Sequence, residues 1–178
     1  MTHDDSLINR NPISFSIWLM PEGSINNQLT NEIQSLHSDF GSPKFKPHVT
    51  LLSSFLGVEK ELLDKTKLIS KKIKPFKIIF GALGNSDDFF QSLYLKVEVT
   101  KELKSARKVA FKNFDCDSKS YPFHLSLAYG NYTLAEKEKM ISSLNRLPDS
   151  FLVNKIFLAH NDEINLRWRV IEGFKLTG

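Results

Sequence analysis

The sequence predicts an α+β protein built from two similar halves, and three observations support this prediction. Short apolar, β-rich runs alternate along the chain with longer segments in which apolar residues recur at helical spacing. Both halves show roughly the order strand, helix, strand, helix, strand. A motif of histidine, any residue and a hydroxyl-bearing residue occurs once in each half, at equivalent places within a β-like run.

The first half is expected to alternate strands and helices. The apolar run Phe15–Met20 stops at Pro21 and predicts a strand. The apolar residues of Ser24–Phe40 recur at helical spacing, and Gly41 is a typical residue just past a helix end. The other elements expected here are a strand at His48–Leu52, a helix at Glu59–Lys72, a strand at Phe76–Phe80, a turn at Gly84–Asp88 and a strand at Ser92–Val99.

The second half repeats this order. A helix is expected over Lys101–Phe114, where apolar residues form one stripe. The remaining elements expected are a strand at His124–Tyr129, a helix at Leu134–Leu144, a strand at Phe151–Ala159, a turn at Asn161–Asn165 and a strand at Trp168–Leu176. We therefore predict one domain over residues 12–178, preceded by a flexible tail at residues 1–11.

The composition is that of an ordinary globular protein, with 41% hydrophobic and 25% charged residues. Lysine and arginine exceed aspartate and glutamate by 24 − 20 = 4, which favours anionic ligands but is too small an excess for a nucleic-acid coat protein. No run reaches the roughly 18 apolar residues of a membrane span. The single cysteine, Cys116, cannot form an intrachain disulfide. We expect a cytoplasmic protein that does not bind membranes.

The repeated motif places an imidazole and a hydroxyl on one side of each predicted strand. The first motif carries His48 and Thr50, and the second carries His124 and Ser126. The residue after each of these four is apolar. Because side chains alternate between the two faces of a strand, His48 shares a face with Thr50, and His124 with Ser126. If the two halves pair symmetrically, two imidazoles and two hydroxyls meet in one cleft.

This set of side chains suits the hydrolysis of a cyclic phosphodiester. With a histidine pKa of about 6.5, one imidazole can take a proton from water while the other donates one to the departing ribose oxygen. Hydroxyls can donate hydrogen bonds to the non-bridging phosphate oxygens as negative charge builds. The sequence has no metal-binding motif such as His-Glu-x-x-His. We therefore expect catalysis without a metal or a cofactor.

These residues resemble the signature of the two-histidine (2H) phosphoesterases, a family marked by a pair of His-x-[Thr/Ser]-x motifs. Within that family, residues 15–21, 45–50 and 124–130, together with residues 90–95, are similar to the cyclic phosphodiesterases of the plant and yeast type. The resemblance extends over nearly the whole chain, from about Phe15 to Leu176. It implies a bilobed fold, in which two pseudo-symmetric lobes of antiparallel sheet with outer helices surround a central cleft.

The resemblance also implies a role for each motif residue. His48 and His124 would perform the acid and base steps, and Thr50 and Ser126 would bind the phosphate. By analogy, His124 would activate water and His48 would protonate the leaving oxygen, although the spacing of the motifs does not distinguish the two histidines. Because one chain can build the whole cleft, we expect a monomer.

Four aromatic residues are further candidates for substrate binding. Tyr129 follows Ser126 by three residues, as in this subgroup, and would help to hold the phosphate or the nucleoside. Trp18, on the first strand, is a candidate for stacking on a base, with packing in the core as an equally weighted alternative. Phe89 and Phe90, near a predicted turn, are weaker candidates of the same kind.

The implied substrates are ADP-ribose 1″,2″-cyclic phosphate, opened to the 1″-phosphate, and nucleoside 2′,3′-cyclic phosphates, opened to 2′-phosphates. RNA ends are a further class of partner. One alternative is the bacterial 2′–5′ RNA ligase-like group, but its second motif runs on into an arginine where this chain has Tyr129 and Gly130. Enzymes that cleave 2′–5′ oligonucleotides are a second alternative. The third is a non-catalytic nucleotide- or RNA-binding module on the same fold, against which the four intact motif residues argue.

Overall fold

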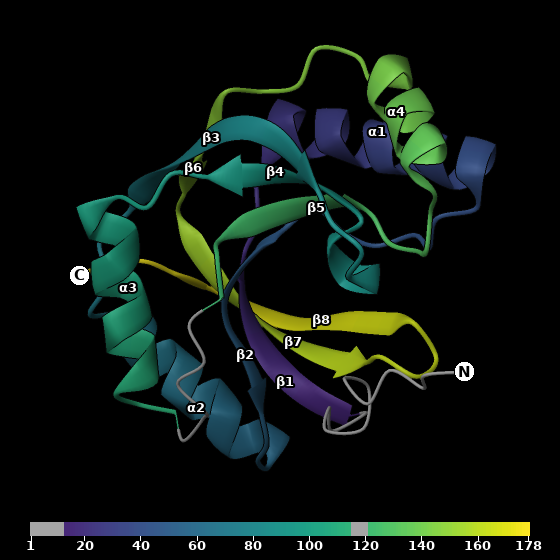
Figure 1. Ribbon diagram of the computed structural model, residues 1–178. Coiled ribbons are helices and arrows are strands. Elements are labelled where there is room, and N and C mark those ends of the chain that lie inside the picture. Colours follow the sequence, from purple (N-terminus) through teal and green to yellow (C-terminus); the bar gives the residue numbers. More distant parts are fainter. Residues whose placement is uncertain (1–12, 115–120) are drawn as a thin grey trace.

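A computed structural model describes residues 13–114 and 121–178. The predicted tail at residues 1–11 and Cys116 lie outside these ranges. The described residues contain strands and helices in alternation (Figure 1), so the predicted α+β class is confirmed. The strands are β1 (Ile13–Leu19), β2 (Val49–Phe55), β3 (Phe76–Asn85), β4 (Leu93–Val97), β5 (His124–Ala128), β6 (Ser150–Val153), β7 (Lys155–Asp162) and β8 (Arg167–Lys175). The helices are α1 (Gly23–Phe40), α2 (Glu59–Ser70), α3 (Lys101–Phe111), α4 (Leu134–Ser143) and the short 3₁₀ helix η2 (Phe89–Gln91).

The eight strands form one curled sheet in the order β6-β3-β4-β5-β2-β1-β7-β8, with antiparallel neighbours throughout. The junction between β5 and β2 is short, because only Val49 and Leu125 are in register there. This junction divides the sheet into two lobes. The β1 lobe contains β2, β1, β7 and β8, and the β4 lobe contains β5, β4, β3 and β6. Figure 1 shows the two groups of strands diverging from this junction.

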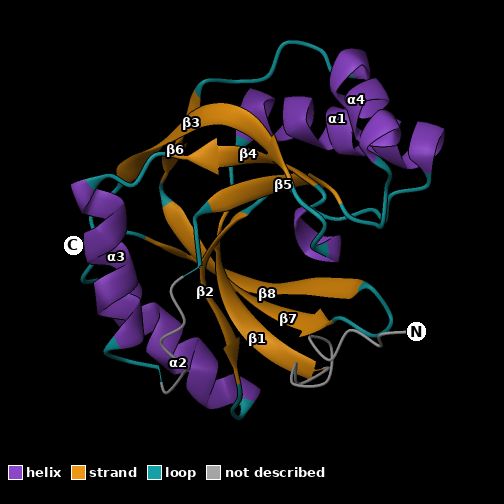
Figure 2. Cartoon of the chain, in the orientation of Figure 1, coloured by secondary structure: helices purple, strands orange, loops and turns teal. Residues whose placement is uncertain are grey.

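Each lobe combines strands from both halves of the chain. The first half supplies β1 and β2 to one lobe but β3 and β4 to the other, and the second half is divided in the same way. The helices cover the outside (Figure 2): α1 packs against β5, α2 against β7 and β8, and α3 against β2 and β3. The segment after α4 is held to α1, because the Asn145 side chain donates to the Glu32 carboxylate at 2.8 Å. Local periodicity identifies each element, but it does not reveal that each lobe is built from strands of both halves of the chain.

The predicted single strand Phe151–Ala159 is wrong, because the chain breaks at Asn154 into β6 and β7. Strand β6 pairs with β3 in the β4 lobe, whereas β7 pairs with β1 in the β1 lobe. The break between the two strands is also visible in which residues are buried. Phe151 and Val153 are buried on β6, but Ile156 and Leu158 are buried on β7, so the alternation changes phase between them.

The predicted turn at Gly84–Asp88 begins too early, because β3 continues to Asn85 and pairs with β4. Its last residues, from Gly81 on, have weak intrinsic strand preference, and they are extended because β4 supplies their hydrogen-bond partners. Gly84 lies opposite Tyr94, and a Cβ atom there would be 2.7 Å from the Tyr94 ring. The turn that follows contains η2, which reaches the junction between the lobes.

Candidate active site at the junction of the two lobes

The junction brings the two His-x-hydroxyl motifs together. His48 directly precedes β2, and His124 is the first residue of β5. In an antiparallel pair with Val49 opposite Leu125, His48 falls opposite Ser126 and Thr50 falls opposite His124. Residues that face each other across two strands lie on the same side of the sheet. All four motif side chains therefore occupy one face, with each imidazole opposite the hydroxyl of the other motif.

The two histidines are held in the same way. The Nδ1 atom of His48 lies 2.7 Å from the carbonyl oxygen of Lys46, and that of His124 lies 2.9 Å from the carbonyl oxygen of Pro122. A carbonyl oxygen only accepts hydrogen bonds, so Nδ1 carries the proton and donates it in both cases. The Nε2 atom of each imidazole is then available to take up or release a proton. This matched geometry is the strongest sign of a shared chemical task.

Trp18 supports His48 rather than presenting a platform for a base. Their rings stack at a centroid distance of 3.7 Å with 10° between the planes. Trp18 is on β1 opposite Thr50, which places it diagonally across from His48. Only 2% of its surface is exposed. A ring so deeply buried offers no open face to a nucleobase. Of the two expectations for Trp18, its burial and its contact with His48 therefore favour packing in the core.

The two imidazoles differ in their electrostatic surroundings. Burial lowers the pKa of His48 to about 4; the hydrogen bond to Lys46 opposes this shift, and the charge of His124 adds to it. Burial also lowers the pKa of His124, but the hydrogen bond to Pro122 and the nearby carboxylate of Asp88 oppose that shift. His48 is 9% exposed, whereas His124 is only half-buried. His48 is therefore the more firmly neutral of the two at neutral pH.

The hydroxyl of Ser126 is held by a backbone carbonyl and lies next to Tyr129. It donates to the carbonyl oxygen of Phe90 at 2.9 Å. The Tyr129 hydroxyl also interacts with the Ser126 side chain, and this interaction lowers the pKa of Tyr129, against the larger effect of burial. Burial raises the pKa of Tyr129, so this hydroxyl keeps its proton. Thr50, the equivalent residue of the first motif, is half-buried on the same face.

The segment between α1 and His48 is anchored to the end of β5. Gly41 ends α1 in the left-handed conformation, with φ of 73°. The carbonyl oxygen of the next residue, Ser42, accepts a hydrogen bond from His37 Nδ1 at 2.7 Å, and its hydroxyl accepts one from the Tyr129 backbone N–H at 3.1 Å. These bonds fix the path of the loop that carries the first motif relative to the second.

An aromatic cluster surrounds Tyr129, and two of its residues were not among the candidates predicted from the sequence. Phe45 stacks on Tyr129 at a centroid distance of 3.9 Å, and Trp168 lies 5.4 Å from the same ring. Phe90 completes the cluster at 5.3 Å from Tyr129, with Phe89 packed against it. The missed residues are Phe45 and Trp168. Both are flanked by basic residues in the sequence, which is the one local signal that could have revealed them.

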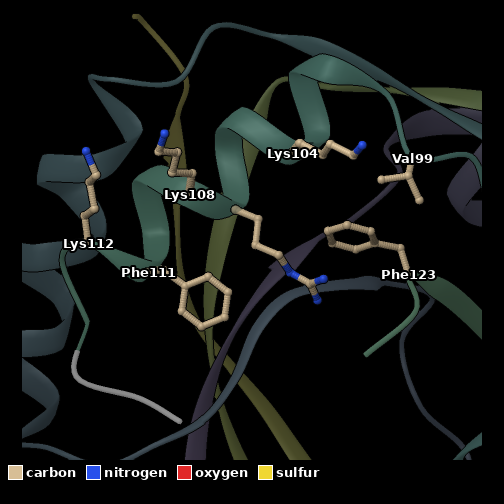
Figure 3. Close-up of a pocket in the computed structure, with 7 residues that line it drawn as sticks. Val99, Lys104, Lys108, Phe111, Lys112 and Phe123 are labelled. Carbon is tan, nitrogen blue, oxygen red and sulfur yellow. The ribbon is translucent and has the colours of Figure 1, made fainter. Parts of the chain in front are cut away.

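A groove of about 450 Å³ lies along α3 and is separate from the motifs (Figure 3). Four basic residues and three apolar ones line it: Val99, Lys104, Arg107, Lys108, Phe111, Lys112 and Phe123. Figure 3 shows Lys104, Lys108 and Phe111 extending from helix α3, with Lys112 just past its end and Phe123 beside it. None of the four motif residues lines it, so we do not place the catalytic chemistry there.

Arg107 in this groove links the two motif strands through hydrogen bonds to their backbones. Its Nε donates to the carbonyl oxygen of Leu51 on β2 at 3.2 Å, and its Nη1 donates to that of Tyr121, just before β5, at 3.1 Å. Its guanidinium also lies over the ring of Phe123, 3.7 Å from the centroid. Because β2 and β5 share a single register pair, this arginine supplies cross-links that the sheet itself lacks.

Arg107→Met is expected to lower the free energy of unfolding by about 2 to 4 kcal/mol, since it removes two charged hydrogen bonds and leaves two carbonyl groups with poorer partners. Methionine keeps much of the apolar stem, so the loss reports the guanidinium. Urea denaturation would measure it. Lys108→Met, at an exposed position in the same groove, is the matched control and should change stability by less than about 0.5 kcal/mol. Equal effects of the two substitutions would contradict the role of Arg107.

Two other observations concern the described residues. Within residues 13–114 and 121–178, no three His, Cys, Asp or Glu side chains gather in a way that could hold a metal ion. In the same ranges, no helix has the length and apolar character needed to cross a membrane.

Comparison with known proteins places the chain in a family. The model of the family described as "Cyclic phosphodiesterase-like protein" matches residues 13–177. The cyclic phosphodiesterase of Arabidopsis thaliana is 27% identical over 156 residues, covering 83% of this chain and 85% of the plant protein. A 2′,3′-cyclic-nucleotide 3′-phosphodiesterase of Yarrowia lipolytica is 33% identical over 107 residues, covering 56% of this chain and 50% of the yeast protein.

Solved structures share the fold. The E. coli LigT structure in complex with 3′-AMP covers 94% of this chain and all of its own, with a TM-score of 0.60 at 13% sequence identity. A Thermus thermophilus structure gives a TM-score of 0.59 at 16% identity, covering 93% of this chain and 98% of its own. The predicted bilobed phosphoesterase fold and the predicted family are thereby confirmed. The chain belongs to the cyclic phosphodiesterase-like protein family, among the two-histidine phosphoesterases, and it is an enzyme of that class.

Proposed function

We propose that this protein hydrolyses cyclic phosphodiesters of nucleotides, using His48 and His124 as the acid and base and no metal ion. The observation that carries the proposal is the matched placement of the two imidazoles. Both lie on one face of adjacent strands, and both donate through Nδ1 to a carbonyl oxygen two residues earlier. Two such groups flanking one phosphorus atom meet the needs of in-line attack and departure.

For a nucleoside 2′,3′-cyclic phosphate, the water oxygen attacks phosphorus and the bond from phosphorus to O3′ breaks. One imidazole takes the proton of the water, and the other gives its proton to O3′, which leaves a 2′-phosphate. The same steps convert ADP-ribose 1″,2″-cyclic phosphate to the 1″-phosphate. We propose that Thr50 and Ser126, which share this face of the sheet, bind the non-bridging oxygens, with Ser126 exchanging its hydrogen bond to Phe90 for one to the phosphate and Tyr129 beside it.

The electrostatics favour His48 as the base and His124 as the acid. A base must be neutral before the reaction, and burial keeps His48 neutral. An acid must hold a proton; burial lowers the pKa of His124 as well, but the hydrogen bond to Pro122 and the carboxylate of Asp88 oppose that shift. This is the reverse of the roles that the family resemblance alone implies.

The direct test is hydrolysis, in the presence of a chelator, of ADP-ribose 1″,2″-cyclic phosphate and of the four nucleoside 2′,3′-cyclic phosphates, with 2′- and 3′-phosphate products resolved. Turnover to 1″- or 2′-phosphate products is the expected result. A requirement for added divalent metal would contradict the mechanism. If none of the five substrates is opened, the activity proposed here is wrong, and 2′–5′ linked oligonucleotides become the next substrates to assay.

The pH dependence of kcat/KM is expected to be bell-shaped, with both limbs at or below pH 6.5. The rate should rise with pH as His48 loses its proton, near pH 4, because the base must be neutral. It should fall with pH as His124 loses its proton, and the pKa of His124 is lowered from 6.5. Initial rates at subsaturating substrate, measured from pH 3.5 to 9, test this. Two limbs above pH 7 would contradict the assignment.

A further inference from the structure

A second groove, of about 390 Å³, lies next to the aromatic cluster, and nothing in the proposed chemistry at the histidines uses it. We call it the basic–aromatic groove. Two short segments line it, one from the loop before β2 and one from the start of β8. Its residues are Lys44, Phe45, Lys46, Leu166, Arg167 and Trp168.

The groove adjoins both motifs. Lys46 supplies the carbonyl oxygen that accepts the hydrogen bond from His48. Phe45 stacks on Tyr129, whose hydroxyl interacts with the Ser126 side chain. Trp168 lies 5.4 Å from the Tyr129 ring and 6.3 Å from Phe45. A ligand whose phosphate is held by the motifs can therefore extend past this cluster into the groove.

Both lining segments alternate aromatic and basic residues, as Lys-Phe-Lys and Arg-Trp-Arg. The lysines and Arg167 are exposed, whereas Trp168 is half-buried. Arg169, the last residue of the second segment, forms an ion pair with Glu59 and does not line the groove. Leu166 has a φ of 51°, a conformation that residues with a branched side chain rarely adopt, at the turn that presents Arg167 and Trp168. Aromatic rings between cations are the elements that bind a base and its phosphate in single-stranded nucleic acids.

The charge of the groove defines the ligand further. A mononucleoside cyclic phosphate has one phosphate, and the motifs hold it. Three more cations beside a ring cluster match a second phosphate and a second base. We propose that the basic–aromatic groove is a subsite for a phosphate-linked nucleotide attached beyond the reacting cyclic phosphate. This inference rests on the proposed function and adds to it the residues that recognise the part of the substrate beyond the cyclic phosphate, and so favour extended nucleotides over mononucleosides.

Two ligands share this chemistry and can be distinguished by assay. One is a dinucleotide ending in a 2′,3′-cyclic phosphate, in which a phosphodiester links the second nucleotide. The other is ADP-ribose 1″,2″-cyclic phosphate, in which a diphosphate does so. For the wild-type protein, kcat/KM for at least one of them should exceed that for adenosine 2′,3′-cyclic phosphate. The larger of the two values identifies the linkage.

Trp168→Ala should lower this preference by roughly 5- to 150-fold, the range that stacking of one base supplies. Trp168→Tyr should restore most of it, because tyrosine keeps an aromatic face. Lys44→Glu and Arg167→Glu should also lower the preference, and the loss should shrink at high salt. Lys65→Glu, an exposed charge reversal on α2, is the matched control and should leave the preference unchanged. Equal kcat/KM values for extended and mononucleoside substrates would overturn the subsite.

Binding separates failure of the subsite from failure of the proposed activity. If no cyclic phosphate is turned over, the activity proposed above is wrong, and calorimetric titration with unreactive ADP still tests the groove. Weaker binding of ADP to Trp168→Ala and Arg167→Glu than to the wild-type and Lys65→Glu proteins would support the subsite. Equal binding to all four proteins would overturn it.

Discussion

Replacing either His48 or His124 with alanine is expected to lower kcat by roughly 10²- to 10⁴-fold, the contribution that a positioned general acid or base makes. The structure gives the reason for expecting losses of similar size. Each imidazole is fixed by one Nδ1 hydrogen bond and lies on the shared face of β2 and β5. Water at the same position would be a poorer base and a poorer acid. Single-turnover kinetics with saturating enzyme would measure the chemical step directly.

The control for this prediction is His160→Gln. His160 lies on β7, where its ring packs edge-on against Phe15, and it takes no part in the site. Its replacement should change kcat by less than about threefold, in keeping with the small effects of substitutions outside such features. The double variant His48→Ala, His124→Ala should lose less than the product of the two single losses, because the histidines act on one transition state. Wild-type turnover by the double variant would show that the site is elsewhere.

The sequence predicts the elements and the motif residues well, for physical reasons that are local. Periodicity of 3.6 or 2 residues depends only on which face of an element is buried, so helices such as α1 and strands such as β5 can be recognised from their own residues. The face-sharing of His48 with Thr50 follows from strand alternation alone. Where the alternation changes phase, at Asn154, one strand becomes two, and the boundary can be placed only once the burial of both sides is known.

Contacts between residues far apart in the sequence cannot be predicted from local patterns. The site residues that the sequence analysis missed, Phe45 and Trp168, depend on such contacts. Periodicity does not say which strand a given strand will join, so the exchange of strands between the two halves is not visible in the sequence. Phe45 and Trp168 meet only because the loop before β2 and the start of β8 flank the same end of the junction. Asp88, the N-cap of η2, is close enough to His124 for its charge to raise the pKa of that histidine, and this proximity is not visible in the sequence. Trp18 could be assigned to the core or to a base with equal reason until its ring was found on His48.

Substitution of sulfur for the leaving oxygen is expected to distinguish the two histidines. In a nucleoside 2′,3′-cyclic phosphate with sulfur in place of O3′, the departing thiolate needs no proton, because a thiol has a pKa of about 8.5, far below that of an alcohol. With this substrate, the variant that lacks the acid should therefore regain most of the kcat it has lost, a gain on the order of 10²-fold or more. The variant that lacks the base should not recover, because water must still lose its proton.

From the electrostatics of the site, we expect His124→Ala to be rescued and His48→Ala not to be. The wild-type protein assayed on both substrates corrects for the intrinsic reactivity of the sulfur compound. Rescue of His48→Ala alone would reverse the roles and restore those implied by the family resemblance. The reversal would also require substrate to change the order of the two pKa values, because the buried His48 would have to bind a proton before the reaction. The phosphate anion is the group able to do so, and the pH profiles of kcat and kcat/KM would then differ in their acid limbs.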